Sequence, residues 1–275
     1  MTYESIRYVV AENVAHIVLN RPHKKNALDM VMRDELWHAV AQARDDADVR
    51  AVLLAGAGSD FCAGGDVSTM RPGELDAEAG RIRISSVTRG AYSLLELPKP
   101  VIAAVDGCAY GAGFSLALAS DIVLATERSR FCLSFLRLGL VPDAAALFTL
   151  PRAVGAYRAK HLLYTAQEID GRTALDYGIA GELVAEDQLH DRAWQVAAAM
   201  AKMPPTAFAL CKSALLRSFS AETAVMADME MNGQGIAYST QYHADAARRF
   251  LDKKGLPYSW PKPNKAPAPG GGGGQ

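Results

Sequence analysis

Paired cysteines, clustered histidines and an excess of one charge are all missing from this sequence. Because the four cysteines form no C-x-x-C pair and stand in apolar contexts, we expect buried free thiols in a reducing cytoplasm. These are Cys62, Cys108, Cys132 and Cys211. The six histidines lack metal-ligand spacing, so no metal site is expected. The 29 basic and 30 acidic residues nearly cancel and are dispersed, which argues against a nucleic-acid partner.

A long apolar run is also missing. The most apolar stretch, 101–125, contains Asp106 and Asp121, whereas a membrane-spanning helix needs about 20 apolar residues with few charges. The first ten residues contain Glu4 and Arg7 and no apolar core, so no signal peptide is expected. With half of its residues hydrophobic and 21% charged, the chain has the composition of a soluble globular protein, and we expect it in the cytoplasm without a membrane partner.

Short apolar runs alternate with helical patterns over the first half of the chain. Runs typical of strands lie at 6–10, 14–19, 51–55, 101–105 and 122–125. Patterns typical of helices lie at 26–46, 81–96 and 114–119. This alternation indicates an α/β fold with parallel strands joined by helical crossovers.

The second half of the chain is almost wholly helical in pattern. The expected helices lie near 156–166, 170–177, 187–202, 205–218, 220–239 and 242–254. The helix at 220–239 is rich in methionine, which is typical of a core or a subunit interface. The stretch 261–275 is rich in proline, lysine and glycine, so we expect a disordered tail.

Two glycine-rich segments, 60–66 and 106–114, directly follow two of the predicted strands. Ligands gather at the carboxyl ends of parallel strands, and small residues let backbone amides approach them closely. The second segment also opens a helix, whose first amides lack acceptors. Two such amides aimed at one point would stabilise an enolate oxygen on a thioester. The alternative is that these glycines form only tight turns.

Several motifs, in order, resemble those of the crotonase (enoyl-CoA hydratase/isomerase) superfamily. RPHKKNAL at 21–28 resembles its R-P-x-x-x-N-A-L entry, and FCAGGD at 61–66 its F-x-A-G-x-D loop. The run from 100 to 122 resembles its K-P-x-I-A-A-V-x-G segment with the following glycines and D-I. The stretches 138–143 and 150–155 resemble the next loop and helix. The resemblance spans about residues 3–258.

The resemblance implies a spiral of ββα repeats with a helical C-terminal region that trimerises, often as a dimer of trimers. On this basis we expect a spiral core over 1–200, a helical oligomerisation region over 201–260 and the tail over 261–275. It further implies an acyl-CoA substrate and no separate cofactor, because coenzyme A is part of the substrate.

Carried over by position, the resemblance also implies a set of site residues. Ala63 and Ala112 are expected to supply the two oxyanion amides. The other expected substrate-binding residues are Lys24, Lys25, Ala27, Gly64, Gly65, Asp66, Val67, Tyr110, Gly111, Phe135, Phe250 and Lys253. Of these, the residues that lie where the family holds adenosine are Lys24, Lys25, Ala27, Asp66 and Val67. Phe250 and Lys253 match a helix that reaches the coenzyme A of a neighbouring subunit.

The acid/base residues depart from the hydratase pattern. The family's hydratases use two glutamates, and this chain has Ser115 and Phe135 at those positions. The remaining nearby carboxylate is Asp143, which resembles the acid/base of phenylacetate-pathway ring-enoyl-CoA isomerases. One carboxylate suffices to move a proton between carbons. Neighbouring apolar side chains predict a raised pKa for Asp143; alternatively, Asp143 only caps a helix beginning at Ala144.

Three functions therefore remain open. The first is an isomerase that shifts a double bond in an enoyl-CoA, with Asp143 as the proton shuttle. The second is a hydratase that adds water to a 2-enoyl-CoA. The third is a non-catalytic acyl-CoA-binding protein, which the two missing glutamates would allow. Tyr110 and Phe114 either line the acyl pocket or pack in the core.

Overall fold

The computed structural model describes residues 2–69, 73 and 75–262. Six strands form the main sheet, in the order β1-β2-β3-β4-β6-β9. They are β1 (Ile6–Ala11), β2 (Val14–Leu19), β3 (Ala51–Gly56), β4 (Val101–Val105), β6 (Ile122–Ala125) and β9 (Glu182–Leu183). Only β1 and β2 pair antiparallel within this sheet. A small second sheet contains β5 (Cys108–Tyr110), β7 (Arg130–Cys132) and β8 (Ile169–Asp170).

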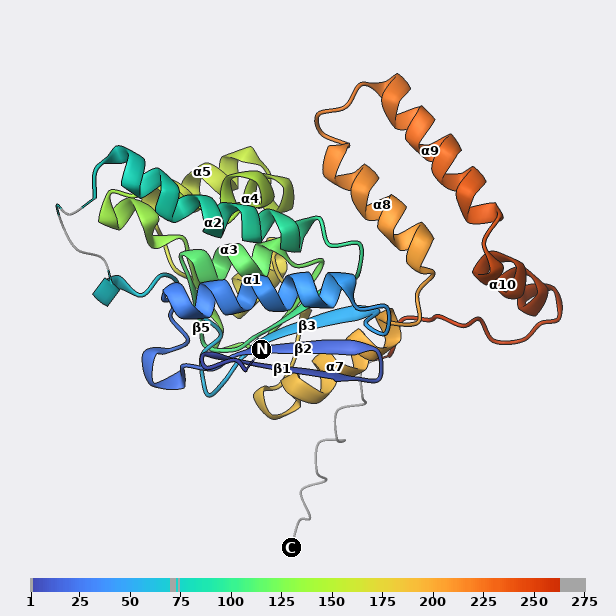
Figure 1. Cartoon of the computed structure of the whole chain (residues 1–275), viewed down its shortest axis with the longest axis horizontal. Coiled ribbons are helices and arrows are strands. Elements are labelled where there is room, and N and C mark those ends of the chain that lie inside the picture. Colours follow the sequence, from blue (N-terminus) through green and yellow to red (C-terminus); the bar gives the residue numbers. More distant parts are fainter. Residues whose placement is uncertain (1, 70–72, 74, 263–275) are drawn as a thin grey trace, which may run out of the picture.

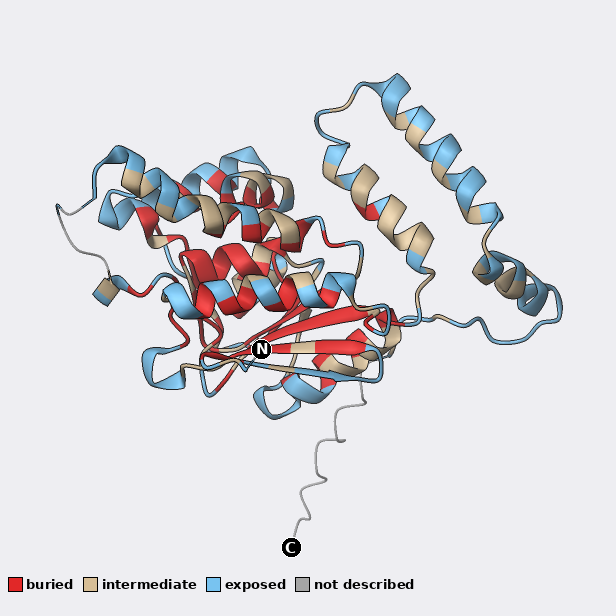
Figure 2. Ribbon diagram, viewed as in Figure 1, coloured by how far each residue is buried: buried red, intermediate tan, exposed pale blue. Residues whose placement is uncertain are grey.

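Helices cover both faces of the main sheet, which is why its central strands are almost continuously apolar. On one face lie α1 (Met30–Asp45), α2 (Ala77–Leu95) and α3 (Ala112–Ala119), packed over side chains such as Leu54. On the other face, α7 (Leu189–Met200) packs on Leu53. Buried residues concentrate between these layers (Figure 2). The predicted α/β architecture with helical crossovers is confirmed.

The structure corrects two predicted element boundaries. The helix expected from residue 26 begins at Met30, because Asp29 caps it by accepting a hydrogen bond from the Met32 amide at 2.8 Å. Upstream, the Asn26 side chain is buried and donates to the backbone carbonyls of Ala57 and Asp60 at 2.8 and 2.7 Å. That turn therefore ties the start of the chain to the first glycine-rich segment. Strand β5, which was not among the predicted strands, also lies within the second glycine-rich segment.

The C-terminal half contains the expected helices. After the core helices α4 (Ala146–Val154), α5 (Ala156–Thr165) and α6 (Gly171–Asp176) and then α7, three more project away from the core (Figure 1). These are α8 (Pro205–Arg217), α9 (Thr223–Tyr238) and α10 (Gln241–Leu251), which we call the C-terminal arm. Of the tail predicted over 261–275, residues 263–275 lie outside the described residues.

The C-terminal arm contacts the core mainly through α8, where Phe208 and Leu216 pack against core residues and Lys212 forms a buried ion pair. Lys212 on α8 contacts Asp121 at 2.7 Å, and the same carboxylate accepts the Val101 amide at 2.8 Å. The other two helices of the arm, α9 and α10, contain no buried residue in a single chain (Figure 2). The methionine-rich α9 is therefore not part of this subunit's core. The prediction of four buried thiols is wrong for Cys211, which is exposed on α8, whereas the other three are buried.

Candidate active site

The two glycine-rich segments lie side by side because β3 and β4 are parallel neighbours that end at the same edge of the sheet. The Cys62 amide donates to the Cys108 carbonyl, and the Tyr110 amide donates back to the Cys62 carbonyl, both at 2.9 Å. Gly64 has a φ of +92°, and a Cβ there would lie 2.6 Å from the Tyr110 carbonyl oxygen. Only glycine allows this approach, which confirms the predicted convergence of the two segments.

The amide of Ala63 cannot serve as an oxyanion donor, contrary to the prediction. It already donates to the Lys25 carbonyl at 2.9 Å. The residues that follow Ala63 bond to Leu28. The Asp66 amide donates to the Leu28 carbonyl at 3.0 Å, and the Leu28 amide donates to the Gly64 carbonyl at 2.7 Å. In an extended segment alternate amides point to opposite sides. The Gly65 amide therefore points away from Leu28.

Ala112, the second predicted donor, is the first residue of α3. Amides in the first turn of a helix have no intrahelical acceptor. Within the described part of the chain, neither Gly65 nor Ala112 donates to a protein acceptor. A Cβ built on Gly64 would lie 3.5 Å from the Ala112 nitrogen, so the two segments meet here. The structure thus pairs Gly65 with Ala112 in place of Ala63 with Ala112.

Both amide positions line one cavity of about 130 Å³. With these two, nine predicted site residues line the cavity: Ala63, Gly64, Gly65, Asp66, Val67, Gly111, Ala112, Phe135 and Asp143. Residues that sequence reasoning did not assign to the site are Leu28, Arg33, Arg83, Ile84, Val87, Ser134, Leu138 and Leu140. Arg83, Ile84 and Val87 share one face of α2. The helical period could have grouped them, but nothing in the local sequence says what that face meets.

Asp143 does not cap a helix. Ala144 and Ala145 adopt left-handed backbone conformations, with φ of 50° and 67°, and α4 begins only at Ala146 without a side-chain cap. The Asp143 Oδ1 atom is buried and has no hydrogen-bond partner among the described residues. Burial raises the pKa of Asp143 to about 6, and the positive charge of Arg33 partly opposes this shift. The carboxyl is thus poised to exchange a proton near neutral pH.

The other carboxylate of the cavity is already engaged. Asp66 pairs with Arg21 at 3.0 Å and accepts from the Ser68 hydroxyl at 2.6 Å. These hydrogen bonds hold the pKa of Asp66 below its usual range. Asp66 therefore fixes the loop around Val67, and Asp143 is the carboxylate left for proton transfer.

The two positions at which the family's hydratases have glutamates contain no acid. Ser115 is fully buried, and its hydroxyl donates back to the Gly111 carbonyl at 3.2 Å within α3. Phe135 lines the cavity with its ring. Neither side chain can activate a water molecule.

Two aromatic residues predicted near the acyl group lie elsewhere. The Tyr110 hydroxyl donates to the Glu168 carboxylate, and Tyr110 is not among the residues lining the cavity. Tyr110 therefore does not line this cavity, and its contact with substrate stays a prediction. Phe114 is buried against Phe131, with ring centroids 5.1 Å apart, and belongs to the core.

Of the residues expected to bind the remainder of coenzyme A, Asp66 and Val67 line the cavity, and the others lie outside it. Lys24 and Lys25 are exposed on the turn next to the first segment, and Ala27 is buried beside them. Phe250 on α10 is 71% exposed, and Lys253 follows that helix at the far end of the C-terminal arm (Figure 1). A single chain does not bring these last two to the cavity.

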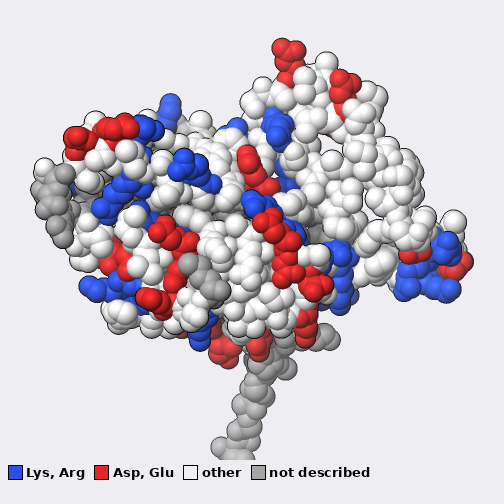
Figure 3. Space-filling view, in the orientation of Figure 1, with Lys and Arg blue, Asp and Glu red and all other residues white. Residues whose placement is uncertain are grey.

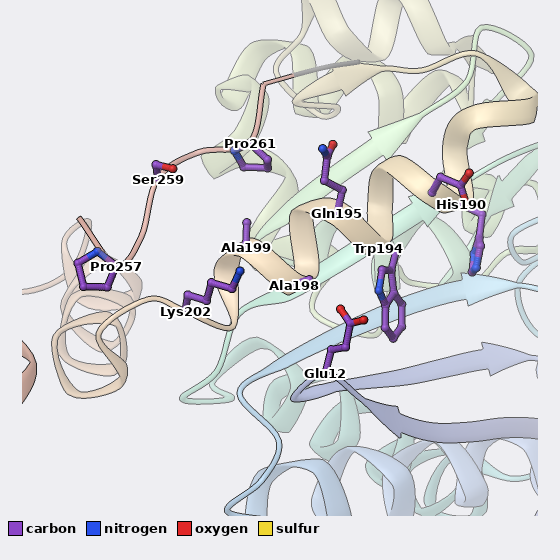
Figure 4. A pocket seen from close by; sticks show the side chains of 11 residues that line it. Glu12, His190, Trp194, Gln195, Ala198, Ala199, Lys202, Pro257, Ser259 and Pro261 are labelled. Atoms are coloured by element: carbon purple, nitrogen blue, oxygen red, sulfur yellow. The ribbon is translucent and has the colours of Figure 1, made fainter. Parts of the chain in front are cut away.

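A larger hollow of about 870 Å³ lies on the opposite face of the sheet, against α7. Figure 4 shows that Trp194 and His190 line it from α7, while Pro257 and Pro261 approach from the segment after the C-terminal arm. None of the residues around it belongs to the glycine-rich segments. It lacks the paired amides and the carboxyl of the smaller cavity.

Comparison with known proteins shows which family the chain belongs to. The family model described as enoyl-CoA hydratase/isomerase matches residues 10–260. The chain belongs to this family. It has the crotonase fold: a crystal structure of an enoyl-CoA hydratase/isomerase from Cupriavidus metallidurans superposes with a TM-score of 0.91 at 37% identity, covering 96% of this chain and 100% of that one.

Two curated relatives indicate the activities found among similar proteins. A probable enoyl-CoA hydratase of Rhodobacter capsulatus is 35% identical over 260 residues, 92% of this chain and 97% of that protein. The 1,2-epoxyphenylacetyl-CoA isomerase of Escherichia coli is 33% identical over 251 residues, 89% of this chain and 94% of the isomerase. The chain is therefore an enzyme of the crotonase superfamily.

Proposed function

We propose that this enzyme moves a double bond within an enoyl-CoA, with Asp143 carrying the proton. The Asp143 carboxylate removes a proton from the carbon next to the thioester of a 3-enoyl-CoA. The electron pair moves onto the thioester oxygen, where the amides of Gly65 and Ala112 stabilise the negative charge. The Asp143 carboxylic acid then returns the proton to the carbon at the other end of the conjugated system. Substrate and product have the same composition.

One observation supports this proposal above the others: a single unengaged carboxyl, with a pKa of about 6, shares a small cavity with two free amides. A general base works best when its pKa lies near the working pH. Asp143 also borders a second cavity of about 230 Å³ between α2 and the loop before α4. That opening gives an acyl chain room to extend past the carboxyl.

Hydration is the weaker alternative, although a relative is named as a hydratase. Hydration needs one group to activate water and a proton for the adjacent carbon. With Ser115 and Phe135 in place of the hydratase glutamates, Asp143 would have to do both. A purely acyl-CoA-binding role leaves the buried, unpartnered Asp143 oxygen without a purpose.

The remaining properties follow from the same proposal. We propose that coenzyme A enters as part of the substrate, that no separate cofactor is needed, and that the enzyme works in the cytoplasm. No helix in the described part of the chain is long and apolar enough to cross a membrane. On the face shown in Figure 3, basic and acidic side chains are interspersed, as expected for a protein without a nucleic-acid partner.

The test is to incubate the purified enzyme with a panel of 2-enoyl- and 3-enoyl-CoA esters and to analyse the products by mass and absorbance. Isomerisation leaves the mass unchanged and alters the absorbance of the conjugated thioester. A product heavier by one water molecule would instead establish the hydratase.

Replacing Asp143 with Asn tests the proton shuttle. The amide has nearly the same shape and cannot accept the proton, so turnover should fall by about 10²–10⁴-fold. Binding of a saturated CoA ester, measured by calorimetry, should change little. The profile of kcat/KM against pH in the wild-type enzyme should rise with an apparent pKa near 6, because the carboxylate is the active form. Unchanged turnover in Asp143→Asn would eliminate Asp143 as the base.

A further inference from the structure

Two arginines line the same cavity as the paired amides and Asp143. Arg33 extends from α1 and is only 6% exposed. Its Nε donates to the Asp29 carbonyl at 3.2 Å, and one terminal nitrogen contacts the Met30 sulfur. Arg83 extends from α2 and donates to the Thr69 carbonyl and hydroxyl, at 3.4 and 3.0 Å. All of these acceptors are uncharged.

Two carboxylates, Asp66 and Asp143, share the cavity with these arginines, but neither arginine forms an ion pair within the described part of the chain. Asp66 is paired with Arg21, and Asp143 forms no ion pair among the described residues. Burying a guanidinium without an anionic partner is costly. Burial, as the largest influence, and the charge of Arg83 lower the pKa of Arg33, and the charges of Asp34, Asp143 and Asp29 only partly oppose this shift. Each guanidinium has five N–H donors in a fork that suits a carboxylate, and several of these donors have no acceptor among the described residues.

We propose that the acyl group of the substrate ends in a carboxylate, which Arg33 and Arg83 bind. This inference rests on the proposed function, since it names the substrate class of the same site. An anion between the two guanidiniums would compensate their charge and orient the chain with its thioester oxygen at Gly65 and Ala112. The Asp143 carboxyl would then face the carbons in between.

The phosphates of coenzyme A are the other anions that the substrate contains. They lie beyond the pantetheine chain from the thioester, whereas both arginines line the cavity that contains the paired amides, with apolar Phe135, Leu138 and Val87 beside them. The arginines share this cavity with Asp143, at the reacting end of the ligand. The acyl carboxylate is therefore the anion that fits.

The experiment compares saturated esters, which bind without reacting. Adipyl-CoA and hexanoyl-CoA have acyl chains of the same length and differ in the terminal carboxylate. Calorimetry with the full-length wild-type enzyme should give at least about 10-fold tighter binding for adipyl-CoA, because hydrogen bonds to a charged group contribute more than neutral ones. The shorter pair, glutaryl-CoA and pentanoyl-CoA, tests the reach of the arginines. Equal or tighter binding of both uncharged esters would overturn the proposal.

Substitutions then test whether the two arginines cause the preference for adipyl-CoA. Arg83→Gln and Arg33→Met should each remove most of the preference for adipyl-CoA while leaving hexanoyl-CoA binding within a few-fold. Arg83 is only half-buried, so Arg83→Gln remains informative even where Arg33→Met fails to fold. Arg89→Gln is the matched control, because Arg89 lies on the same helix, is exposed and does not line the cavity. A preference that persists in Arg83→Gln and Arg33→Met would also overturn the assignment.

This measurement separates the two proposals. Saturated esters cannot isomerise, so their affinities do not depend on whether Asp143 transfers a proton. A clear preference for adipyl-CoA together with no isomerisation of any enoyl ester would refute the proposed function alone. Isomerisation of uncharged esters without any preference for the carboxylate would refute only the substrate class.

Discussion

Burial raises the pKa of the Asp143 carboxyl and the charge of Arg33 lowers it, and burial has the larger effect. A carboxyl whose pKa rises from 3.8 when unfolded to about 6 when folded stabilises the fold fully only below pH 4. That contribution is lost as the pH rises through 6. At neutral pH the folded protein therefore bears the cost of a buried charge.

The substitution Asp143→Asn should remove this cost. We expect the variant to be more stable than the wild type at pH 7.5, by on the order of 1 kcal/mol once partial solvent exposure is allowed for. The difference should shrink towards pH 4.5. Urea unfolding at both pH values measures it. A difference that stays the same at both pH values would contradict the pKa shift.

The free amides of Gly65 and Ala112 make a second prediction about single residues. Hydrogen exchange resolved to individual amides should be fast at Gly65 and Ala112 in the free enzyme, and should slow when a saturated CoA ester binds. The Ala63 amide, bonded to Lys25, should exchange slowly in both states and is an internal control. Protection that appears at Ala63 and not at Gly65 would restore the original assignment.

This distinction was beyond the reach of the sequence. The FCAGGD motif locates the loop, but which of its amides is free depends on Lys25 and Leu28, about 38 residues earlier in the chain. The position of Asp143 was identified correctly from the sequence. Asp143 does not cap a helix because Ala144 and Ala145 form a left-handed turn, which the helix propensity of alanine does not predict.

At the level of elements, strands and long helices were predictable, and short strands were not. The apolar runs at β3 and β4 are buried on both faces, so their patterns identify them. Strands β5, β7 and β8 have two or three residues each, and pairing with one another across the chain defines them. The packing of α3 against the first glycine-rich segment likewise depends on a contact distant in sequence.

That contact gives a prediction about α3. A methyl group on Gly113 would overlap the Cys62 carbonyl oxygen, so Gly113→Ala should push the start of α3 away and displace the Ala112 amide. We expect a loss of about 1–3 kcal/mol in stability and at least a 10-fold loss of turnover. Gly80→Ala in α2 is the control. With nothing within 4 Å of the added methyl, it should stabilise by roughly 0.5–1 kcal/mol.

At the level of the whole molecule, the C-terminal arm is incomplete in one subunit. Large apolar side chains on it are exposed, including Met231 at 65%, Phe250 at 71% and Leu251 at 80%. Contiguous exposed apolar surface usually marks an interaction site. The core provides the paired amides and Asp143 by itself, whereas neither Phe250 nor Lys253 is among the described residues that line this cavity in the same chain. Assembly would explain both observations.

We therefore expect sedimentation to give three or six times the chain mass of 29.4 kDa. The double substitution Phe250→Asp and Leu251→Asp places two charges on the exposed apolar face of α10, so it should yield smaller species and weaken CoA-ester binding at least several-fold. Val9→Asp on β1 is the control, because Val9 is also exposed, at 58%, but lies away from the arm. A wild-type monomer at micromolar concentration, or a double variant with unchanged mass, would mean that α10 covers nothing in a neighbouring subunit and that the cavity works within one chain.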